Sequence, residues 1–244
     1  MDYVFDIDGT LTPSRLKIDP EFESFFLDWM KNKDVVLVTG SDKDKTIEQV
    51  GEKIWTNAKR VYQSCGNAVY EKGELMKMNQ FALSFPLRDV LEDFKKNSEW
   101  KDKFGNHIEE RIGLINFSTI GRDCPQEERE RYAIWDAEKK EREYFCWKIQ
   151  EVFPELEASV GGQISIDIYT KGQNKAQVLN DIKGNLIFFG DRCEPGGNDY
   201  PIIERLEKEN EKTIGSPFGD LARRKYRIHN VKSYKDTWDI LKTY

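Results

Sequence analysis

Segments of strand length alternate with amphipathic stretches along the first 80 residues. The strand candidates are Tyr3–Phe5, Val35–Val38 and Arg60–Gln63. Between the first two, aromatic residues recur at helical spacing after Asp19 and Pro20, a pair that suits a helix cap and first turn. The order strand, helix, strand, helix, strand predicts a parallel sheet wrapped by helices.

Two further elements complete this part of the chain. Ser41 and Asp44 have the spacing of a capping box, which predicts a helix from Lys45 to Trp55. The segment Ala68–Met76, with Lys72-Gly73 at its middle, predicts a hairpin.

The pattern changes between residues 81 and 171. An amphipathic helix is predicted around Leu87–Phe94, and an antiparallel hairpin at Ile108–Ser118, interrupted by Gly113. A charged helical region runs from Gln126 to Val152, and its predicted apolar face consists of Phe145, Ile149, Val152 and Phe153.

The stretch Gly161–Tyr169 alternates with a period of two, so its isoleucines take one strand face while Ser165 and Asp167 share the other. Past Gly172 the first pattern resumes. It predicts a helix at Lys175–Ile182, a strand at Leu186–Phe189 followed by Gly190-Asp191, a glycine-rich loop at 194–199, a charged helix to about Lys212 and a last helix at Tyr234–Leu241.

These elements predict an α/β protein with a Rossmann-like core and a parallel sheet, built from residues 1–80 and 172–244. Residues 81–171 are predicted to form an inserted α+β cap with an antiparallel sheet. Clefts between two such units are where small ligands usually bind.

Composition narrows the class of protein. Of the 244 residues, 38% are hydrophobic and 34% charged, and no apolar run reaches the length of a membrane span. The chain opens without a basic-then-apolar leader, so we expect a cytoplasmic protein that binds no membrane. The net charge of -6 argues against nucleic-acid binding. The scattered cysteines are expected to stay reduced, and His107 and His229 to be structural.

The first strand ends in two carboxylates. Asp6 and Asp8 leave an extended backbone on the same side, and Gly9 permits the tight turn that follows. Crowded carboxylates repel unless a cation or a proton lies between them. The pattern suits phosphoryl transfer, in which one carboxylate attacks phosphorus and the other moves a proton.

Other residues at element ends fit the same chemistry. Asp191 also follows an apolar strand, and with Asp6 and Asp8 it would make a hard oxygen site for Mg²⁺. Lys175 can neutralise charge on Asp6 and on a phosphoryl group, and Thr39 or Ser41 can hydrogen-bond phosphate oxygens. Singly, these residues read as a surface lysine and helix caps; the complete set favours a catalytic phosphate site.

The motifs FDIDGTLT, GSDKDKTIEQVG, INFSTIGRDCPQEER, VGGQISIDIY and FFGDRCEPGGND resemble those of the eukaryotic-type phosphomannomutases in the haloacid dehalogenase superfamily. The resemblance covers nearly the whole chain. It implies interconversion of mannose 6-phosphate and mannose 1-phosphate through a hexose 1,6-bisphosphate, with Mg²⁺, as a step toward GDP-mannose. Asp6 would be the nucleophile and Asp8 the general acid and base.

The resemblance also implies substrate-binding residues. Arg15, Ser165 and Asp167 match positions that contact the sugar phosphate. A mutase needs a second phosphate site on its cap, and bidentate guanidinium groups suit it. The candidates are Arg111, Arg122 and Arg129, aided by a helix start that we expect Cys124 to cap, with Pro125 in the first turn.

For the metal, the resemblance implies ligands that include Asn198 and Asp199, with Thr213 as a remnant of a second cation site. The chain departs from the family at several positions. It has Asn174 where the family has Asp, Ser64-Cys65 for Glu-Asn, Arg192-Cys193 for Lys-Thr and Ile112 for Asn.

Alternative functions stay open at this stage. One is a sugar-phosphate phosphatase of the same superfamily, another a phosphohexomutase that prefers glucose phosphates, and a third a non-catalytic sugar-phosphate binder. The resemblance further implies a homodimer joined through the caps.

Overall fold

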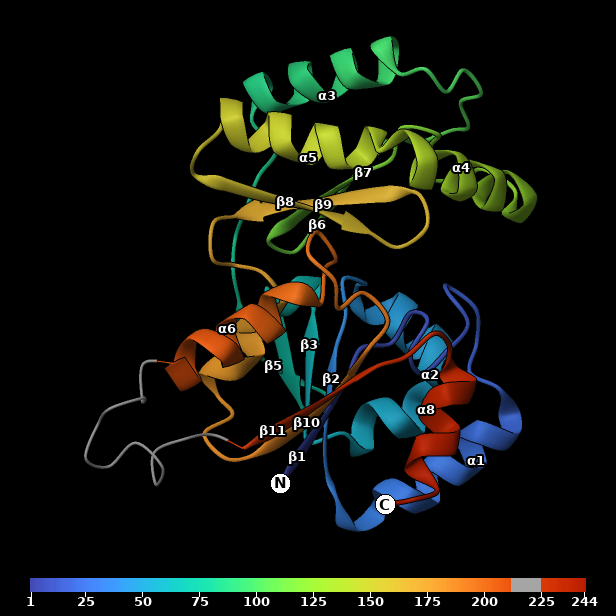
Figure 1. The fold of residues 1–244 in the computed structure, drawn as a ribbon, viewed down its shortest axis with the longest axis vertical. Helices are drawn as coiled ribbons and strands as arrows, with labels where there is room; N and C mark the ends of the chain where they lie inside the picture. The colour runs from blue at the N-terminus through green and yellow to red at the C-terminus, as the bar shows by residue number, and fades with distance from the viewer. Residues whose placement is uncertain (212–224) are drawn as a thin grey trace.

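The computed structural model describes residues 1–211 and 225–244. It contains two separate sheets (Figure 1). We call the seven-stranded sheet with its helices the core and the four-stranded sheet with its helices the cap. The predicted α/β class is confirmed, whereas the division at residues 80/81 and 171/172 stays a prediction.

The core sheet has the strand order β11-β10-β1-β2-β3-β4-β5. Its first five strands in this order are parallel, and the last two form an antiparallel extension. The bounds are β1 Asp2–Phe5, β2 Asp34–Val38, β3 Arg60–Gln63, β4 Ala68–Glu71, β5 Glu74–Met78, β10 Leu186–Gly190 and β11 Tyr226–Asn230.

Helices cover both faces of the core sheet (Figure 1). Helices α1 (Pro20–Trp29), α2 (Lys43–Asn57) and α8 (Tyr234–Leu241) pack on one face around Phe5, Phe22 and Phe26. The 3₁₀ helix η3 (Lys175–Asn180) and helix α6 (Tyr200–Glu211) cover the other. The 3₁₀ turns η1 (Met30–Asn32) and η2 (Ser64–Gly66) follow α1 and β3.

The cap sheet has the order β6-β7-β9-β8, and all its pairs are antiparallel. Helices α3 and α5 pack on its outer face around Ile115, Phe117 and Ile166 (Figure 1). The opposite, inner face of the cap sheet faces the core (Figure 1). The bounds are α3 Phe85–Asn97, β6 Ile108–Arg111, β7 Leu114–Phe117, α4 Gln126–Lys139, α5 Glu141–Val152, β8 Leu156–Gly161 and β9 Ser165–Thr170.

Several sequence expectations were wrong in detail. The long helical region is two helices, because Lys140 adopts φ 61° between α4 and α5, and Val152 is exposed rather than apolar-face core. The predicted helix Lys175–Ile182 is the shorter η3. Strands β8 and β11 were not predicted at all.

Two helix caps also differ from expectation. The N-cap of α2 is Asp42, whose carboxylate accepts a hydrogen bond from Lys45 N at 2.8 Å, and not Ser41. Pro125, not Cys124, occupies the N-cap position of α4 and offers no side-chain cap. The cap of α1 is Asp19, as predicted.

The two segments that connect core and cap meet at one buried side chain. Asn67 Oδ1 accepts a hydrogen bond from Asn79 Nδ2 at 2.9 Å, and Asn67 Nδ2 donates to Gln173 O at 3.1 Å. A Cβ on Gly113, in the β6–β7 turn of the cap, would lie 2.5 Å from Asn67 Cβ. Asn67 therefore contacts both connections and the cap itself.

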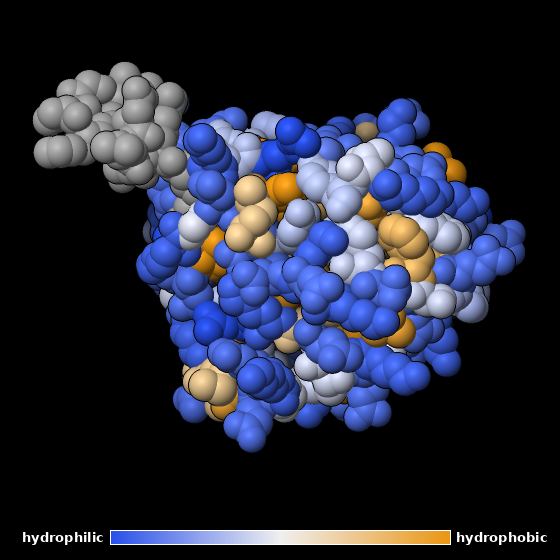
Figure 2. All heavy atoms as spheres, turned by 90° about the horizontal axis from the view of Figure 1, so that it is seen from below, coloured by the Kyte–Doolittle hydropathy of each residue, from blue (hydrophilic) through white to orange (hydrophobic). Residues whose placement is uncertain are grey.

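The remaining surface is ordinary. The face of the core that points away from the cap is mostly hydrophilic, with small separated apolar patches (Figure 2). Within the described residues, no helix is both long and apolar enough to span a bilayer. The four cysteines are free and buried, in agreement with the expected reduced thiols.

Candidate active site

Three neighbouring parallel strands deliver the site residues. Asp6 and Asp8 follow β1, Asp191 follows β10 and Thr39 follows β2, so all four meet at one edge of the core sheet. Gly9 adopts φ +82°, and a Cβ there would lie 2.4 Å from Asp191 Oδ2. Only glycine permits this turn together with the close approach of the Asp191 carboxylate.

Lys175 lies beneath the site and pairs with two carboxylates. Its Nζ is 2.6 Å from Asp6 Oδ1 and 2.7 Å from Asp199 Oδ1, and the residue is only 1% exposed. Burial raises the pKa of Asp6 well above its usual value; Lys175 opposes this effect, and Asp199 and Asp191 add to it. The lysine charge therefore offsets part of the cost of burying the charged Asp6 carboxylate.

Three carboxylates converge at this point. Asp6, Asp191 and Asp199 each place an oxygen within 4.8 Å of the others. Burial, together with the charge of Asp199, raises the pKa of Asp191 to about 7. Asn198 Oδ1 is buried without a hydrogen-bond partner and lines the same cavity. A set of hard oxygens with one orphaned carbonyl fits Mg²⁺.

Asp8, also predicted as a metal ligand, lies outside this three-carboxylate group. Its Oδ1 accepts hydrogen bonds from Arg15 N at 2.6 Å and from Gln49 Nε2 at 2.9 Å. These donors direct the side chain toward the loop that carries Arg15. Thr213, the predicted remnant of a second cation site, lies outside the described residues.

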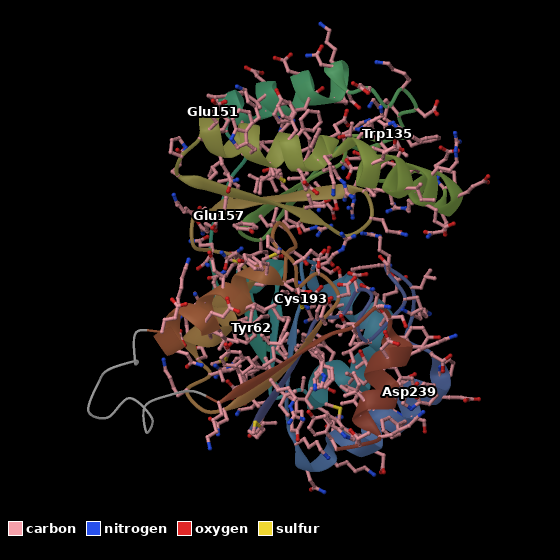
Figure 3. All side chains as sticks on the ribbon, in the orientation of Figure 1. Tyr62, Trp135, Glu151, Glu157, Cys193 and Asp239 are labelled. Atoms are coloured by element: carbon pink, nitrogen blue, oxygen red, sulfur yellow. The ribbon has the colours of Figure 1, made fainter. Side chains whose placement is uncertain are left out.

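One cavity between core and cap gathers the predicted site. Among the described residues, all those predicted for the site line it except Lys175 and Asp199, which support it from below. From the core it is lined by Asp6, Asp8, Arg15, Thr39, Ser41, Asp191 and Asn198, and from the cap by Arg111, Arg122, Arg129, Ser165 and Asp167. The side chains that fill the space around this boundary are visible in Figure 3.

Thr39 and Ser41 form a polar corner at the end of β2. Thr39 Oγ1 accepts a hydrogen bond from Ser41 N at 3.0 Å. Because Asp42 caps α2, Ser41 is not needed as a cap and lines the cavity instead. The corner offers hydroxyl groups to an anion held above Asp6.

Two arginines of the cavity wall, Arg111 and Arg122, share one acidic partner. Glu109 Oε2 lies 2.7 Å from Arg111 Nη2 and 3.1 Å from Arg122 Nε. Arg122 Nη1 donates to Asn116 Oδ1 at 2.7 Å, and Arg111 Nη1 donates across the boundary to Gly40 O at 2.7 Å. Both guanidinium groups are thereby fixed in the cavity wall.

Positive charge is in excess on this wall. Burial, together with Arg111 and Arg15, lowers the pKa of Arg122 to about 10. Burial and Arg15 also lower the pKa of Arg129, whose Nη2 donates to Arg122 O while its Nη1 is buried without a partner. Such crowded, partly unsatisfied guanidinium groups are suited to bind an anion.

Ser165 and Asp167 lie on the inner face of β9, as the alternation predicts. Asp167 Oδ1 accepts a hydrogen bond from Asn116 Nδ2 at 2.6 Å, and Ser165 Oγ donates to Gly161 O at 3.1 Å. Burial raises the pKa of Asp167. These groups form the polar roof of the cavity.

Sequence reasoning missed the residues that hold the β8–β9 turn in place. Arg142 of α5 donates to Asp136 Oδ2 at 2.7 Å and, from Nη1, to Gly162 O at 3.1 Å and to the carbonyls of Gly161 and Ser165. From the core, Arg192 Nη2 donates to Gly162 O at 3.0 Å. No local motif marks such long-range contacts.

The departure at Asn174 has a structural reason. Asn174 Oδ1 caps η3 by accepting from Ala176 N, and Nδ2 donates to Glu157 Oε2 at 3.0 Å. Glu157, labelled in Figure 3, lies on the side of the cap that faces the core. An aspartate would keep the cap bond and repel Glu157.

We therefore expect Asn174→Asp to lower the free energy of unfolding by about 1 kcal/mol, because it replaces a hydrogen bond by like charges. Urea unfolding measures the change. Adding Glu157→Gln should recover most of the loss, and a purely additive double variant would show that the two side chains do not interact.

Comparison with known proteins places these features in a family. A sequence model described as "Eukaryotic phosphomannomutase" matches residues 22–223. The chain belongs to the eukaryotic phosphomannomutase family. It is thus a member of an enzyme family, and the family suggested by the motifs is confirmed.

Individual members align along most of their length. The phosphomannomutase of Drosophila melanogaster is 35% identical over 254 residues, which cover 98% of this chain and 92% of the fly protein. That of Nicotiana benthamiana is 34% identical over 96% of this chain and 90% of its own.

Solved structures share the fold at low identity. The C-terminal domain of trehalose-6-phosphate phosphatase from C. albicans matches 99% of this chain and 90% of its own, with a TM-score of 0.63 and 16% identity. A haloacid dehalogenase-like hydrolase from Bacteroides thetaiotaomicron covers 99% of this chain and 98% of its own, with a TM-score of 0.58 and 13% identity. The phosphomannomutase family member thus has the haloacid dehalogenase fold with a cap.

Proposed function

We propose that the enzyme interconverts mannose 6-phosphate and mannose 1-phosphate through an aspartyl phosphate on Asp6 and a hexose 1,6-bisphosphate. The observation that carries the proposal is one cavity with two anion-binding walls. The lower wall contains the Asp6 carboxylate, with Lys175 paired to it from below, and the upper wall contains Arg111, Arg122 and Arg129.

In the proposed reaction, an Asp6 oxygen attacks the near phosphorus of the bisphosphate and the bond from phosphorus to the sugar oxygen breaks. Lys175, 2.6 Å from Asp6 Oδ1, offsets the negative charge that gathers on the carboxylate and the phosphoryl group. The Thr39–Ser41 corner donates hydrogen bonds to phosphoryl oxygens. The products of this step are the aspartyl phosphate and a sugar monophosphate.

Asp8 moves the proton in this scheme. It gives a proton to the sugar oxygen as that oxygen leaves the near phosphorus. When the free hydroxyl of an incoming sugar monophosphate attacks the aspartyl phosphate and forms the bisphosphate, Asp8 takes a proton back from that hydroxyl. The bisphosphate then turns round, so that its other phosphate is transferred to Asp6. Because the same residue serves in both directions, the enzyme returns to its starting protonation state after each cycle.

Asp6, Asp191, Asp199 and Asn198 are the residues that would hold Mg²⁺. When bound, Mg²⁺ would offset negative charge on the phosphoryl group during transfer. The buried, unpartnered Asn198 Oδ1 supports this assignment.

The cap arginines would hold the far phosphate while the near one is exchanged. Arg111 and Arg122 share the single negative charge of Glu109, so this wall carries a net positive charge. An incoming phosphate would supply the negative charge that balances it. Closing the cavity over the sugar would also keep water from the aspartyl phosphate, which a mutase requires and a phosphatase does not.

A coupled assay with mannose 1-phosphate and Mg²⁺, with and without glucose 1,6-bisphosphate, tests the proposal. We expect formation of mannose 6-phosphate that depends on the bisphosphate. Release of inorganic phosphate at the same rate without it would identify a phosphatase instead, and faster turnover of glucose 1-phosphate would identify a glucose-preferring mutase.

The variant Asp8→Asn should fold and bind Mg²⁺ but lose about 10²- to 10⁴-fold in turnover, the usual contribution of a general acid and base. An asparagine oxygen can still accept the hydrogen bonds from Arg15 N and Gln49 Nε2, so we expect the variant to keep its fold. Turnover, the melting temperature and the Mg²⁺ dependence are the measurements. A near-normal rate would remove Asp8 from this role.

The resemblance to the family suggests a wider setting. We propose a cytoplasmic homodimer joined through the caps that supplies mannose 1-phosphate for GDP-mannose synthesis. Sedimentation of the purified chain tests the dimer.

A further inference from the structure

Asp8 has one carboxylate oxygen that is held by donors and one that is not. Oδ1 accepts from Arg15 N at 2.6 Å and from Gln49 Nε2 at 2.9 Å. Within the described residues, no donor contacts Oδ2, and Asp8 lines the cavity. The two bonds to Oδ1 fix the rotation of the carboxylate and so determine where Oδ2 lies.

Gln49 lies two residues before a break in α2. Gly51 has φ 80° and ψ 150°, which lie outside the helical region, and Gln49 O accepts a hydrogen bond from Ile18 N at 2.8 Å. Gln49 Nε2 also lies 3.2 Å from Thr12 Oγ1. One residue therefore ties the helix to both the turn after Asp8 and the loop that carries Arg15.

The Gln49 side chain is buried and only partly hydrogen-bonded. It is 1% exposed, and its Oε1 is buried without a hydrogen-bond partner. A buried polar group with an unsatisfied end is costly, and a hydrophobic side chain would avoid that cost. The amide is thus better explained by its contact with Asp8 than by a contribution to stability.

We propose that Gln49 is a positioning residue that holds Asp8 Oδ1, so that Oδ2 exchanges the proton with the sugar oxygen. The inference rests on the proposed role of Asp8. In the forward step, the proton passes from Oδ2 to the sugar oxygen as its bond to phosphorus breaks, and the resulting carboxylate keeps both N–H donors on Oδ1. Gln49 itself forms no bond to the substrate.

Two phosphoryl donors distinguish positioning from a general structural role. A sugar alkoxide needs a proton to leave, whereas the acetate of acetyl phosphate leaves without one. We expect Gln49→Met to lower kcat of the mutase reaction by about 10- to 100-fold with KM for mannose 1-phosphate nearly unchanged. Phosphorylation of Asp6 by acetyl phosphate should stay within about threefold of wild type.

Gln63→Met is the matched control, because Gln63 is equally buried but lies in β3 away from the cavity lining. It should retain wild-type rates with both donors. Gln49→Asn, which withdraws the amide by one methylene, should show the same selective loss and serves if the methionine variant does not fold.

Equal losses with the sugar phosphate and acetyl phosphate would overturn the inference, as would no loss with either. A wild-type enzyme without bisphosphate-dependent turnover would instead contradict the proposed function. In that case the rate of mannose 1-phosphate hydrolysis is measured in place of the mutase rate. A loss in the Gln49 variant with mannose 1-phosphate but not with acetyl phosphate would still support the positioning role.

Discussion

Lys175→Met is expected to lower turnover by at least about 10³-fold, because it removes a buried cation that pairs with both Asp6 and Asp199. It should also lower the free energy of unfolding by about 3–5 kcal/mol, since two buried carboxylates lose their partner. Without the lysine charge the pKa of Asp6 rises further, which favours the protonated form that cannot act as a nucleophile. Turnover is measured with Mg²⁺. The free energy of unfolding is measured by urea unfolding in the presence of a chelator.

A second variant separates the two effects. Lys175→Met combined with Asp199→Asn removes one of the unpaired acids and should regain part of the stability, but not the activity. Lys53→Met, at an exposed position of α2, should change neither. A Lys175→Met protein with wild-type turnover would contradict the assignment of Lys175 to the phosphoryl site.

Arg142→Met is expected to lower the free energy of unfolding by about 3–5 kcal/mol. It leaves the buried Asp136 carboxylate without its charged partner and removes the Arg142 side-chain hydrogen bonds to the carbonyls of Gly161, Gly162 and Ser165. Because the β8–β9 turn lines the cavity, KM for the sugar phosphate should rise as well. Urea unfolding and steady-state kinetics are the measurements.

Two further arginine variants serve as controls for Arg142→Met. Arg142→Lys keeps a positive charge near Asp136, so it should lose less free energy of unfolding than Arg142→Met. It should still lose some, because lysine lacks the planar guanidinium group. Arg131→Met removes an exposed pair with Glu128 and should cost less than about 1 kcal/mol. If Arg142→Met unfolded at the same urea concentration as Arg131→Met, the buried pair would have no structural role.

The elements that could be predicted carry their own periodicity. The alternation in β9 identified its polar face, and the apolar runs of β2 and β10 identified buried strands. Strand β11 lies at the edge of the core sheet and contains Arg227 and His229, so it shows no apolar run. The edge strand β8 is also largely half-buried and was missed for the same reason.

The site could be predicted where topology alone brings residues together. Asp6, Thr39 and Asp191 follow parallel strands, whose carboxyl ends share one edge. Gln49 and Arg142 could not be predicted in this way. Gln49 reaches Asp8 across 41 residues, and Arg142 reaches Gly162 across 20, so only the folded chain reveals either contact.

Asn67 limits how the enzyme could exchange its cap in evolution or by design. Its side chain bonds to Asn79 on one connection and to Gln173 on the other, and the backbone of Gly113 packs directly against it. A chimaera that took residues 81–171 from a relative would keep Asn67, Asn79 and Gln173 together as one unit, and the donor cap would have to supply a glycine at the position of Gly113. Recombination points inside that unit would separate residues that fit only one another.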